Sequence, residues 1–206
     1  MGKNASQAAT ETIPSTNFLQ LETLVLASKS PRRAEILRAV GWPFEAVTAG
    51  IDETLKADED AITYVTRLAQ EKAEAVAERI NKGLVLGADT TVVVEGTILG
   101  QPRDEEEARE MLRLLSGQWH EVCTGVALLR AENAVFAKGH EVTRVRFSKL
   151  SEDEIARYAA SDEPKDKAGA YAVQGAAALF IEEIQGDYFN IMGLPVRLVY
   201  KLAREI

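Results

Sequence analysis

The pattern of apolar and polar positions predicts strands and helices that alternate along the chain. Short continuous apolar runs predict strands, and longer segments with apolar residues at helical spacing predict helices. The predicted strands cover about residues 23–28, 44–48, 84–88, 91–94, 98–99, 119–130, 134–147 and 179–184. The predicted helices cover about residues 31–40, 60–81, 104–117 and 151–160, and one more helix closes the chain. This order predicts a mixed α/β fold, with one sheet, helices packed on its faces, and a cleft.

Several helix boundaries carry recognisable signals. Asp104 with Glu107, and Ser151 with Glu154, have the spacing of a capping box. In the long predicted helix, about Asp60–Asn81, one face collects the apolar residues: Val65, Leu68, Ala69, Ala73, Val76 and Ile80. These signals place the helix starts and indicate which face of the long helix packs on the sheet.

The composition limits the classes of function. With 206 residues, 46% of them hydrophobic, the chain can form one large core or two small lobes that share a sheet. Its net charge of −8 argues against a general nucleic-acid-binding protein. Cys123 is the only cysteine, which excludes an internal disulfide and a cysteine zinc site. His120 and Cys123 share a predicted strand, and we expect both to be structural.

The N-terminal residues 1–20 are polar and without periodicity, so we expect a tail before a single domain over residues 21–206. The tail begins Met1-Gly2-Lys3-Asn4-Ala5-Ser6, which matches a myristoylation pattern. One acyl chain without a polybasic segment binds membranes only marginally. No signal-peptide region is evident, and no apolar run approaches the roughly 20 residues that span a bilayer. We therefore expect a soluble, cytoplasmic protein with no stable membrane association.

The segment Ser28–Arg33 joins the first predicted strand to the first predicted helix. Ser30 can cap that helix, and Pro31 suits its first turn. Arg32 and Arg33 then stand among the free N-terminal amides, where positive charge opposes the helix dipole unless an anion is bound. Amides, dipole and guanidinium groups together predict a site for a phosphate chain.

Two carboxylates are candidates for the chemistry at this site. Asp89 follows the apolar run Leu84–Ala88, so we expect it at the carboxyl end of a strand, where α/β folds bind ligands. Glu53 lies in a predicted turn. A triphosphate commonly arrives with Mg²⁺, which prefers oxygen ligands. Glu53 and Asp89 are therefore candidates to bind a divalent metal, orient a water molecule or accept its proton.

Other polar residues have less specific signals. Lys72 lies on the long predicted helix among charged neighbours, so the pattern alone favours a solvated side chain. Lys167 lies in a polar loop beside Gly169, where it can contact a phosphate. Gln174 offers a donor and an acceptor, which suits the edge of uracil or thymine, but a glutamine that caps backbone groups fits the pattern too.

A set of motifs from about residue 23 to the C-terminus resembles, in order, those of Maf proteins. One such motif would be weak, whereas an ordered set over one domain is specific. The motifs are Ser28–Arg33, Ile51-Asp52-Glu53, Glu71-Lys72-Ala73, Gly87-Ala88-Asp89-Thr90, Leu115-Ser116-Gly117, Asp166-Lys167-Ala168-Gly169, Tyr171–Gly175, Gly186-Asp187-Tyr188 and Gly193-Leu194-Pro195.

This resemblance implies a nucleoside triphosphate pyrophosphatase. Such enzymes cleave between the α and β phosphates, releasing a nucleoside monophosphate and pyrophosphate, and are thought to remove non-standard nucleotides. The resemblance implies a divalent metal cofactor, Mg²⁺ or Mn²⁺, and a small-molecule nucleotide as the partner. It also implies a mixed α/β sheet in two lobes around a deep cleft, similar to inosine triphosphatases, and often a homodimer.

The resemblance further implies a role for each candidate residue. Glu53 and Asp89 organise the metal and the attacking water, with Asp89 as the base. Lys72 and Lys167 neutralise charge on the leaving pyrophosphate. The other residues bind the substrate: Ser30, Arg32 and Arg33 at the phosphates, and Thr90 and Gln174 at the pyrimidine. The positions of Arg32, Thr90 and Gln174 resemble the branch that acts on dTTP and UTP rather than the 7-methyl-GTP branch.

Gln101 departs from the family pattern, which usually has lysine between Gly100 and Pro102. Glutamine can hydrogen-bond a phosphate oxygen but carries no charge, and this loss would cost about tenfold in rate or more. Arg103, two residues on, is a candidate replacement. A low-turnover nucleotide-binding regulator linked to cell division is therefore an alternative to the enzyme. A phosphosugar or phosphoester enzyme of similar topology is a further one, which rests on fold analogy alone.

Overall fold

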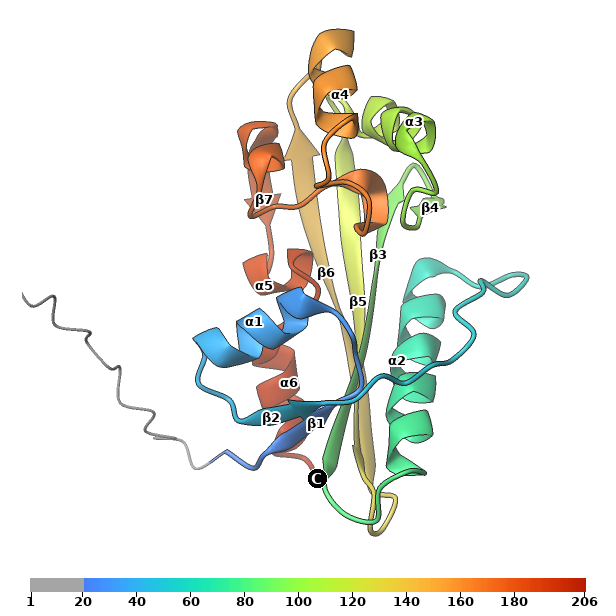
Figure 1. The fold of residues 1–206 in the computed structure, drawn as a ribbon, viewed down its shortest axis with the longest axis vertical. Coiled ribbons are helices and arrows are strands. Elements are labelled where there is room, and N and C mark those ends of the chain that lie inside the picture. Colours follow the sequence, from blue (N-terminus) through green and yellow to red (C-terminus); the bar gives the residue numbers. More distant parts are fainter. Residues whose placement is uncertain (1–20) are drawn as a thin grey trace, which may run out of the picture.

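The computed structural model of the protein describes residues 21–206, and the predicted tail with its myristoylation pattern lies outside the described residues. Residues 21–206 form a seven-stranded sheet with the order β2-β1-β3-β5-β6-β7, and β4 pairs with β3 (Figure 1). β1 runs parallel to β2 and β3, and the other pairs are antiparallel. The strands are β1 (Leu24–Leu26), β2 (Phe44–Ala46), β3 (Leu84–Val94), β4 (Thr97–Leu99), β5 (Trp119–Arg130), β6 (Phe136–Phe147) and β7 (Ile181–Gln185).

Helices cover both faces of the sheet. They are α1 (Pro31–Ala39), α2 (Ala61–Ala77), α3 (Glu105–Leu115), α4 (Glu152–Ala159), α5 (Tyr188–Ile191) and α6 (Val196–Ala203), with 3-10 turns η1 (Ala168–Ala170) and η2 (Ala176–Leu179). Leu84 and Leu86 of β3 share a core with α1 and α6, whereas Val85 shares one with α2. This follows from the strand period, because successive side chains point to opposite faces. Within residues 21–206, no helix is both long and apolar enough to cross a membrane.

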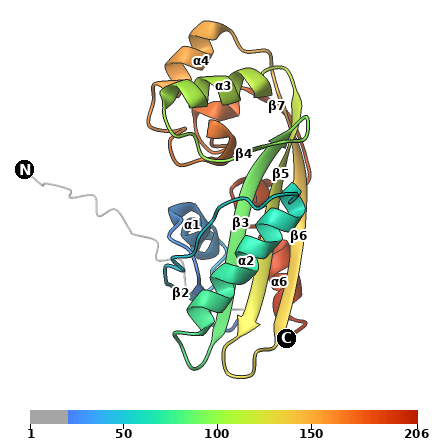
Figure 2. The ribbon, with the colours of Figure 1, turned by 90° about the vertical axis from the view of Figure 1, so that its right-hand side faces the viewer.

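Strands β3, β5 and β6 are long enough to belong to two lobes (Figures 1 and 2). In the upper lobe of both views, α3, α4, η1 and η2 lie beside the end of β3, the start of β5 and the end of β6. This lobe has a core of its own, which includes Val92, Leu112, Val145, Phe147 and Tyr171. The predicted mixed α/β fold in two lobes is therefore confirmed, and the lobes share one sheet.

His120 and Cys123 are buried in this sheet, as expected for structural residues. The Nε2 atom of His120 lies 2.9 Å from the hydroxyl oxygen of Tyr171. The imidazole also packs edge-on against Phe147 and Tyr171. Burial lowers the pKa of His120 to about 4, so the imidazole is neutral near pH 7.

One predicted boundary is wrong in a way that affects the site. Asp89 was expected at the end of a strand, but β3 continues without a break from Leu84 to Val94. The reason is β5, which pairs with β3 from Leu84 to Val93 and keeps its backbone extended. Asp89 therefore lies in the middle of a long strand.

Helix α2 lies close to the sheet because glycines face it. A Cβ atom on Gly87 of β3 would lie 2.0 Å from the backbone oxygen of Ala69. A Cβ atom on Gly125 of β5 would lie 2.3 Å from the backbone oxygen of Val65. The face of α2 that packs here also carries Lys72, which is only 7% exposed. The expectation of a solvated Lys72 was wrong, because this close packing buries the whole face.

We predict that Gly87→Ala destabilises the fold, because the added methyl group would overlap the Ala69 backbone and push α2 away from β3. The free energy of unfolding should fall by about 1–3 kcal/mol or more in urea denaturation. Gly100→Ala is the control, since nothing lies within 4 Å of a Cβ atom added there. Equal stability of the two variants would contradict the close packing of α2.

Candidate active site

A cavity of about 740 Å³ lies at one edge of β3 and is lined by residues of both lobes. β1 pairs with β3 only as far as Leu86, and β4 pairs with it only from Val92. The edge of β3 between these partners lines the cavity, so side chains from both faces of the strand reach it. We call it the β3-edge cavity. It contains every site residue predicted from the sequence: Ser30, Arg32, Arg33, Glu53, Lys72, Asp89, Thr90, Gln101, Lys167 and Gln174.

Lys72, Asp89 and Glu53 form a charged group in this cavity. The Lys72 Nζ atom lies 2.7 Å from Asp89 Oδ1 and 3.0 Å from Glu53 Oε2. The side chains of Lys72 and Asp89 are 8% and 11% exposed, whereas that of Glu53 is 53% exposed. The group therefore consists of a buried ion pair with a second carboxylate on its solvent side.

Burial is the largest influence on the protonation of Asp89. Removal from water raises the pKa of Asp89 above the ordinary value of a carboxyl group, and the charges of Lys72 and Arg33 oppose that rise. A carboxylate with a raised pKa accepts a proton more readily near neutral pH than an exposed one does. The site therefore contains a group suited to act as a general base.

The structure brings Lys72, Asp89 and Glu53 together, but for reasons that differ from those predicted. Asp89 reaches the cavity because β1 stops at Leu86 and leaves this edge of β3 unpaired. It does not reach the cavity because β3 ends there. Lys72 follows Leu68 by four positions and Ala69 by three, which places all of them on one helix face. That spacing was a signal for burial of Lys72, but the charge of its side chain argued the other way.

Arg33 is buried, and its guanidinium group joins several elements. Its Nε atom donates to the backbone oxygen of Gly193 at 2.8 Å. Its Nη atoms donate to Ser28 Oγ at 3.1 Å and to Thr90 Oγ1 at 3.2 Å. Arg33 thus connects α1, β3 and the loop before α6, whereas the sequence predicted only a contact to phosphate.

Arg32 is closer to solvent and pairs with Asp166, a motif residue to which the sequence assigned no role of its own. Its Nη1 atom lies 3.0 Å from Asp166 Oδ2, and its Nη2 atom donates to the backbone oxygen of Asp166 at 3.2 Å. The Lys167 ammonium group also contacts the Asp166 carboxylate. Asp166 therefore balances both cations and links α1 to the loop before η1. Its place next to Lys167 in the sequence was the available signal.

Ser30 occupies the N-cap position of α1, but its hydroxyl group forms no capping hydrogen bond, contrary to the prediction. Its backbone N–H group donates to Ser28 Oγ at 3.1 Å. Because Ser28 Oγ also accepts from Arg33, the Ser28 hydroxyl group holds the turn in place. The Ser30 hydroxyl group is therefore not used to cap the helix. Ser30 lines the cavity, where this hydroxyl group can contact a ligand.

The uncharged candidates lie around the same cavity. Thr90 Oγ1 is 2.9 Å from Thr124 Oγ1, while Gln101 and Gln174 are exposed. Arg103 does not replace the lysine that the family pattern has at position 101. Its side chain is 83% exposed and pairs with Glu107 at 2.9 Å, and it does not line the cavity.

Tyr64 lines the cavity and was missed by sequence reasoning. Its hydroxyl group donates to the backbone oxygen of Glu53 at 2.9 Å and so fixes the turn that presents this carboxylate. Tyr64 precedes Lys72 by eight residues, about two turns of helix, so both lie on one side of α2. That spacing was the only signal for it in the sequence.

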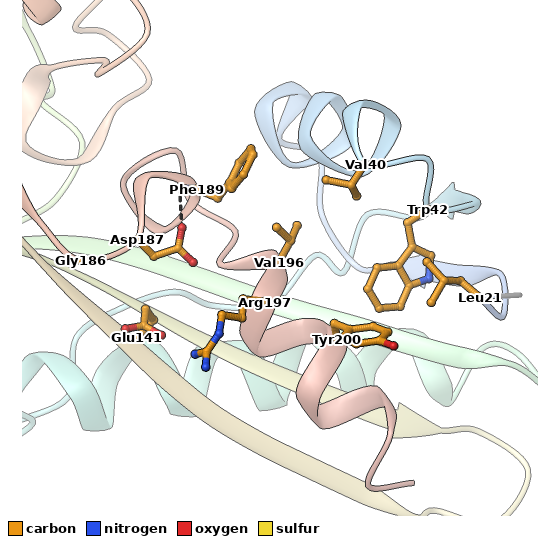
Figure 3. Close-up of a pocket in the computed structure, with 10 residues that line it drawn as sticks. All are labelled: Leu21, Val40, Trp42, Glu141, Gly186, Asp187, Phe189, Val196, Arg197 and Tyr200. Carbon is orange, nitrogen blue, oxygen red and sulfur yellow. Dashed lines mark hydrogen bonds between the residues drawn. The ribbon is translucent and has the colours of Figure 1, made fainter. Parts of the chain in front are cut away.

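A second cavity, of about 610 Å³, is lined by residues of α5, α6 and β6 and by residues that precede β1 or follow α1 and β7 (Figure 3). Its lining is largely apolar and aromatic, with Trp42, Phe189 and Tyr200. The charged groups there are Arg197, Glu141 and Asp187. One cation beside two carboxylates does not favour a phosphate chain, so the β3-edge cavity is the candidate active site.

The carboxylates of the β3-edge cavity fit a divalent metal that enters with a phosphate substrate. Glu53 and Asp89 both reach the Lys72 ammonium group, so their oxygens converge on one small region. Mg²⁺ is commonly bound by one or two carboxylates together with substrate phosphates. Within residues 21–206, no group of three or more acidic, histidine or cysteine side chains forms a metal cage of its own.

The comparison with known sequences gives a consistent result. Residues 23–206 match the family described as "Maf-like protein". The chain is 49% identical over 186 residues to a "dTTP/UTP pyrophosphatase" of Bacillus cereus (strain B4264), which covers 90% of this chain and 95% of that one. It is equally similar to a protein of the same name from Bacillus cytotoxicus, with the same coverage.

Among solved structures, the Ham1 protein of Staphylococcus aureus is similar in fold. The two chains superpose with a TM-score of 0.52, covering 89% of this chain and 99% of that one. Their sequences are only 12% identical, so this similarity concerns the fold alone.

We predict that Arg33 and Arg32 differ in their effect on stability. Arg33→Lys should lower the free energy of unfolding by about 2 kcal/mol or more, because one ammonium group cannot reach the three acceptors of a buried guanidinium. Arg32→Lys should change it by less than about 0.5 kcal/mol, because its ion pair is partly exposed. Urea denaturation measures both, and similar losses would show that Arg33 does not organise the site.

Proposed function

Because this chain belongs to the Maf-like protein family, we propose that it is a nucleoside triphosphate pyrophosphatase that hydrolyses dTTP and UTP. Its products are the nucleoside monophosphate and pyrophosphate, and modified pyrimidine nucleotides are further substrates. Its role is to keep non-standard nucleotides out of nucleic acids. The observation that carries the proposal is the buried Lys72–Asp89 pair in a cavity that also presents Arg32 and Lys167.

The cations of the cavity complement the charge of a triphosphate. Arg32 lies in the first turn of α1, and Lys167 lies in the loop before η1, so they approach from different lobes. We infer that a phosphate group displaces Asp166 from Arg32, because a guanidinium group binds phosphate through paired hydrogen bonds. Ser30 and the N-terminus of α1 add donors and the positive end of the helix dipole.

Asp89 acts as the base in this proposal. It accepts a proton from a water molecule whose oxygen forms a bond to the α-phosphorus. The bond from that phosphorus to the oxygen bridging to the β-phosphate breaks, and pyrophosphate leaves. Lys72, 2.7 Å from Asp89, orients the carboxylate, and together with Lys167 it stabilises the charge that develops on the leaving group.

The proposal includes Mg²⁺ or Mn²⁺ bound by Glu53 and Asp89. The metal would supply Lewis-acid stabilisation of the phosphate oxygens. Tyr64 keeps Glu53 in place for this role through its hydrogen bond to the Glu53 backbone. Thr90 and Gln174 read the pyrimidine, since a hydroxyl and an amide group can match its donors and acceptors.

The partners follow from the same proposal. The ligand is a small nucleoside triphosphate rather than a nucleic acid, which is consistent with the net charge of −8. We also propose that the enzyme acts in the cytoplasm without stable membrane association, and that it forms a homodimer, as the family resemblance implies.

We predict pyrophosphate release from UTP and dTTP, but not from GTP, in the presence of Mg²⁺ or Mn²⁺. Asp89→Asn should lower the rate by at least about 10²-fold, because the amide cannot accept the proton from water. Asp153→Asn is a matched control, since that side chain is 85% exposed on α4 and does not line the cavity. Orthophosphate as the product would point instead to a phosphoester enzyme.

The pH dependence provides a second readout of Asp89. Because burial raises the pKa of Asp89, kcat/KM should fall as the pH decreases through a value above the ordinary pKa of about 3.9. The rate is highest above this pKa, where the carboxylate is ionised. An acid limb at or below the ordinary value would contradict Asp89 as the buried base.

Gln101 favours one alternative, a nucleotide-binding regulator with little turnover and a link to cell division. The position lines the cavity, lacks the usual charge, and Arg103 does not replace it. If the enzyme is active but slowed by this residue, Gln101→Lys should raise kcat about tenfold by adding a charge-assisted contact. Tight nucleotide binding without turnover in both proteins would instead support the regulator.

A further inference from the structure

We propose that Tyr158 and Glu163 are positioning residues that set the base selectivity of the cavity by holding the loop that carries Gln174. The inference rests on the proposed function, because it assigns the source of selectivity at the same site. Neither residue lines the β3-edge cavity. Tyr158 lies on α4, and Glu163 lies in the loop that follows this helix.

Glu163 is hydrogen-bonded to the C-terminal end of the loop that carries Gln174. Its carboxylate accepts hydrogen bonds from the backbone N–H groups of Ala176 at 2.9 Å and Ala177 at 3.3 Å. These amides begin the 3-10 turn η2. Hydrogen bonds to an ionised acceptor are roughly twice as strong as neutral ones, so this contact holds the end of the loop firmly.

Tyr158 is hydrogen-bonded to the N-terminal end of the same loop. Its hydroxyl group accepts a hydrogen bond from the backbone N–H group of Ala172 at 3.2 Å and donates one to Glu163 Oε1 at 2.6 Å. Burial raises the pKa of Tyr158, so the hydroxyl group keeps the proton that it donates. The Tyr158–Glu163 pair therefore joins residue 172 to residues 176–177.

Gly175 shows how closely the carboxylate lies against the loop. A Cβ atom at this position would lie 2.2 Å from Glu163 Oε1, so a larger residue would displace the carboxylate. Val173, on the other side of Gln174, is only 5% exposed. The backbone is thus held on both sides of Gln174, whose exposed side chain lines the cavity.

This arrangement separates recognition of the base from recognition of the phosphates. An amide that reads a base must be held within about 0.5 Å of its working position to favour one hydrogen-bond pattern. The Tyr158–Glu163 pair can supply that precision for Gln174. The groups proposed to bind phosphate and metal lie on α1, α2 and β3, in the turn that carries Glu53 and in the loop that carries Lys167. The hydrogen bonds of the pair go to Ala172, Ala176 and Ala177 and to none of these groups. Loss of the pair should therefore weaken base recognition in particular.

The test compares the KM for UTP with the inhibition constant of inorganic tripolyphosphate, which has no base. Glu163→Gln should raise the KM for UTP about tenfold, because it removes a charged acceptor from the loop. Tyr158→Phe should also raise the KM for UTP. This variant provides the test if Glu163→Gln does not fold. The inhibition constant of tripolyphosphate should be unchanged in both variants, which a general loss of structure would not allow.

Hydrogen exchange gives a readout independent of activity, and the amides of Ala176 and Ala177 should exchange faster in Glu163→Gln. The matched control is Glu152→Gln, which removes an exposed α4 carboxylate paired with Arg113 at 3.0 Å and should change nothing. An unchanged KM for UTP, or an equal rise in both constants, would overturn the inference alone. A parent protein that releases no pyrophosphate from UTP would overturn the proposed function and, with it, this inference.

Discussion

The close approach of α2 to the sheet is the constraint on which the rest of the site depends. Gly87 and Gly125 leave room for the backbone of α2, and this spacing buries Lys72 within 2.7 Å of Asp89. Each buried charge offsets the other, whereas removal of either partner would leave an uncompensated charge in the interior. The same burial raises the pKa of Asp89. Helix packing and the basicity of the carboxylate are therefore two consequences of one contact.

The unpaired edge of β3 explains how one strand contributes two kinds of group to one cavity. Asp89 and Thr90 point to opposite faces of the sheet, toward α2 and α1, where they meet Lys72 and Arg33. In the interior of a sheet, such neighbours would be separated by the backbone and its partner strands. Here β1 has ended and β4 has not begun, so both side chains reach the same space.

Several cavity-lining groups are held by contacts that link distant segments. Arg32 bonds to Asp166 in the other lobe, and Tyr64 fixes the backbone of Glu53. Arg33, which also lines the cavity, connects the start of α1 to Gly193. Preorganised groups lose less free energy when substrate binds, because less conformational freedom remains to be lost. The contact between Arg32 and Asp166 also shows that a phosphate must compete with a carboxylate for this arginine.

The sequence by itself determined the mixed α/β class and most element types, because apolar periodicity is a local property. The set of residues expected in the cavity came from the resemblance of the motifs to those of Maf proteins. Only the tertiary structure decided the burial of Lys72, the position of Asp89 inside a strand and the contacts of Arg33. Those outcomes depend on residues far along the chain, such as Gly193 for Arg33 and the strand β5 for Asp89. A charge on an apolar helix face is buried or solvated according to what packs against it. Here Gly87 and Gly125 on neighbouring strands let α2 pack closely, and Lys72 is buried as a result.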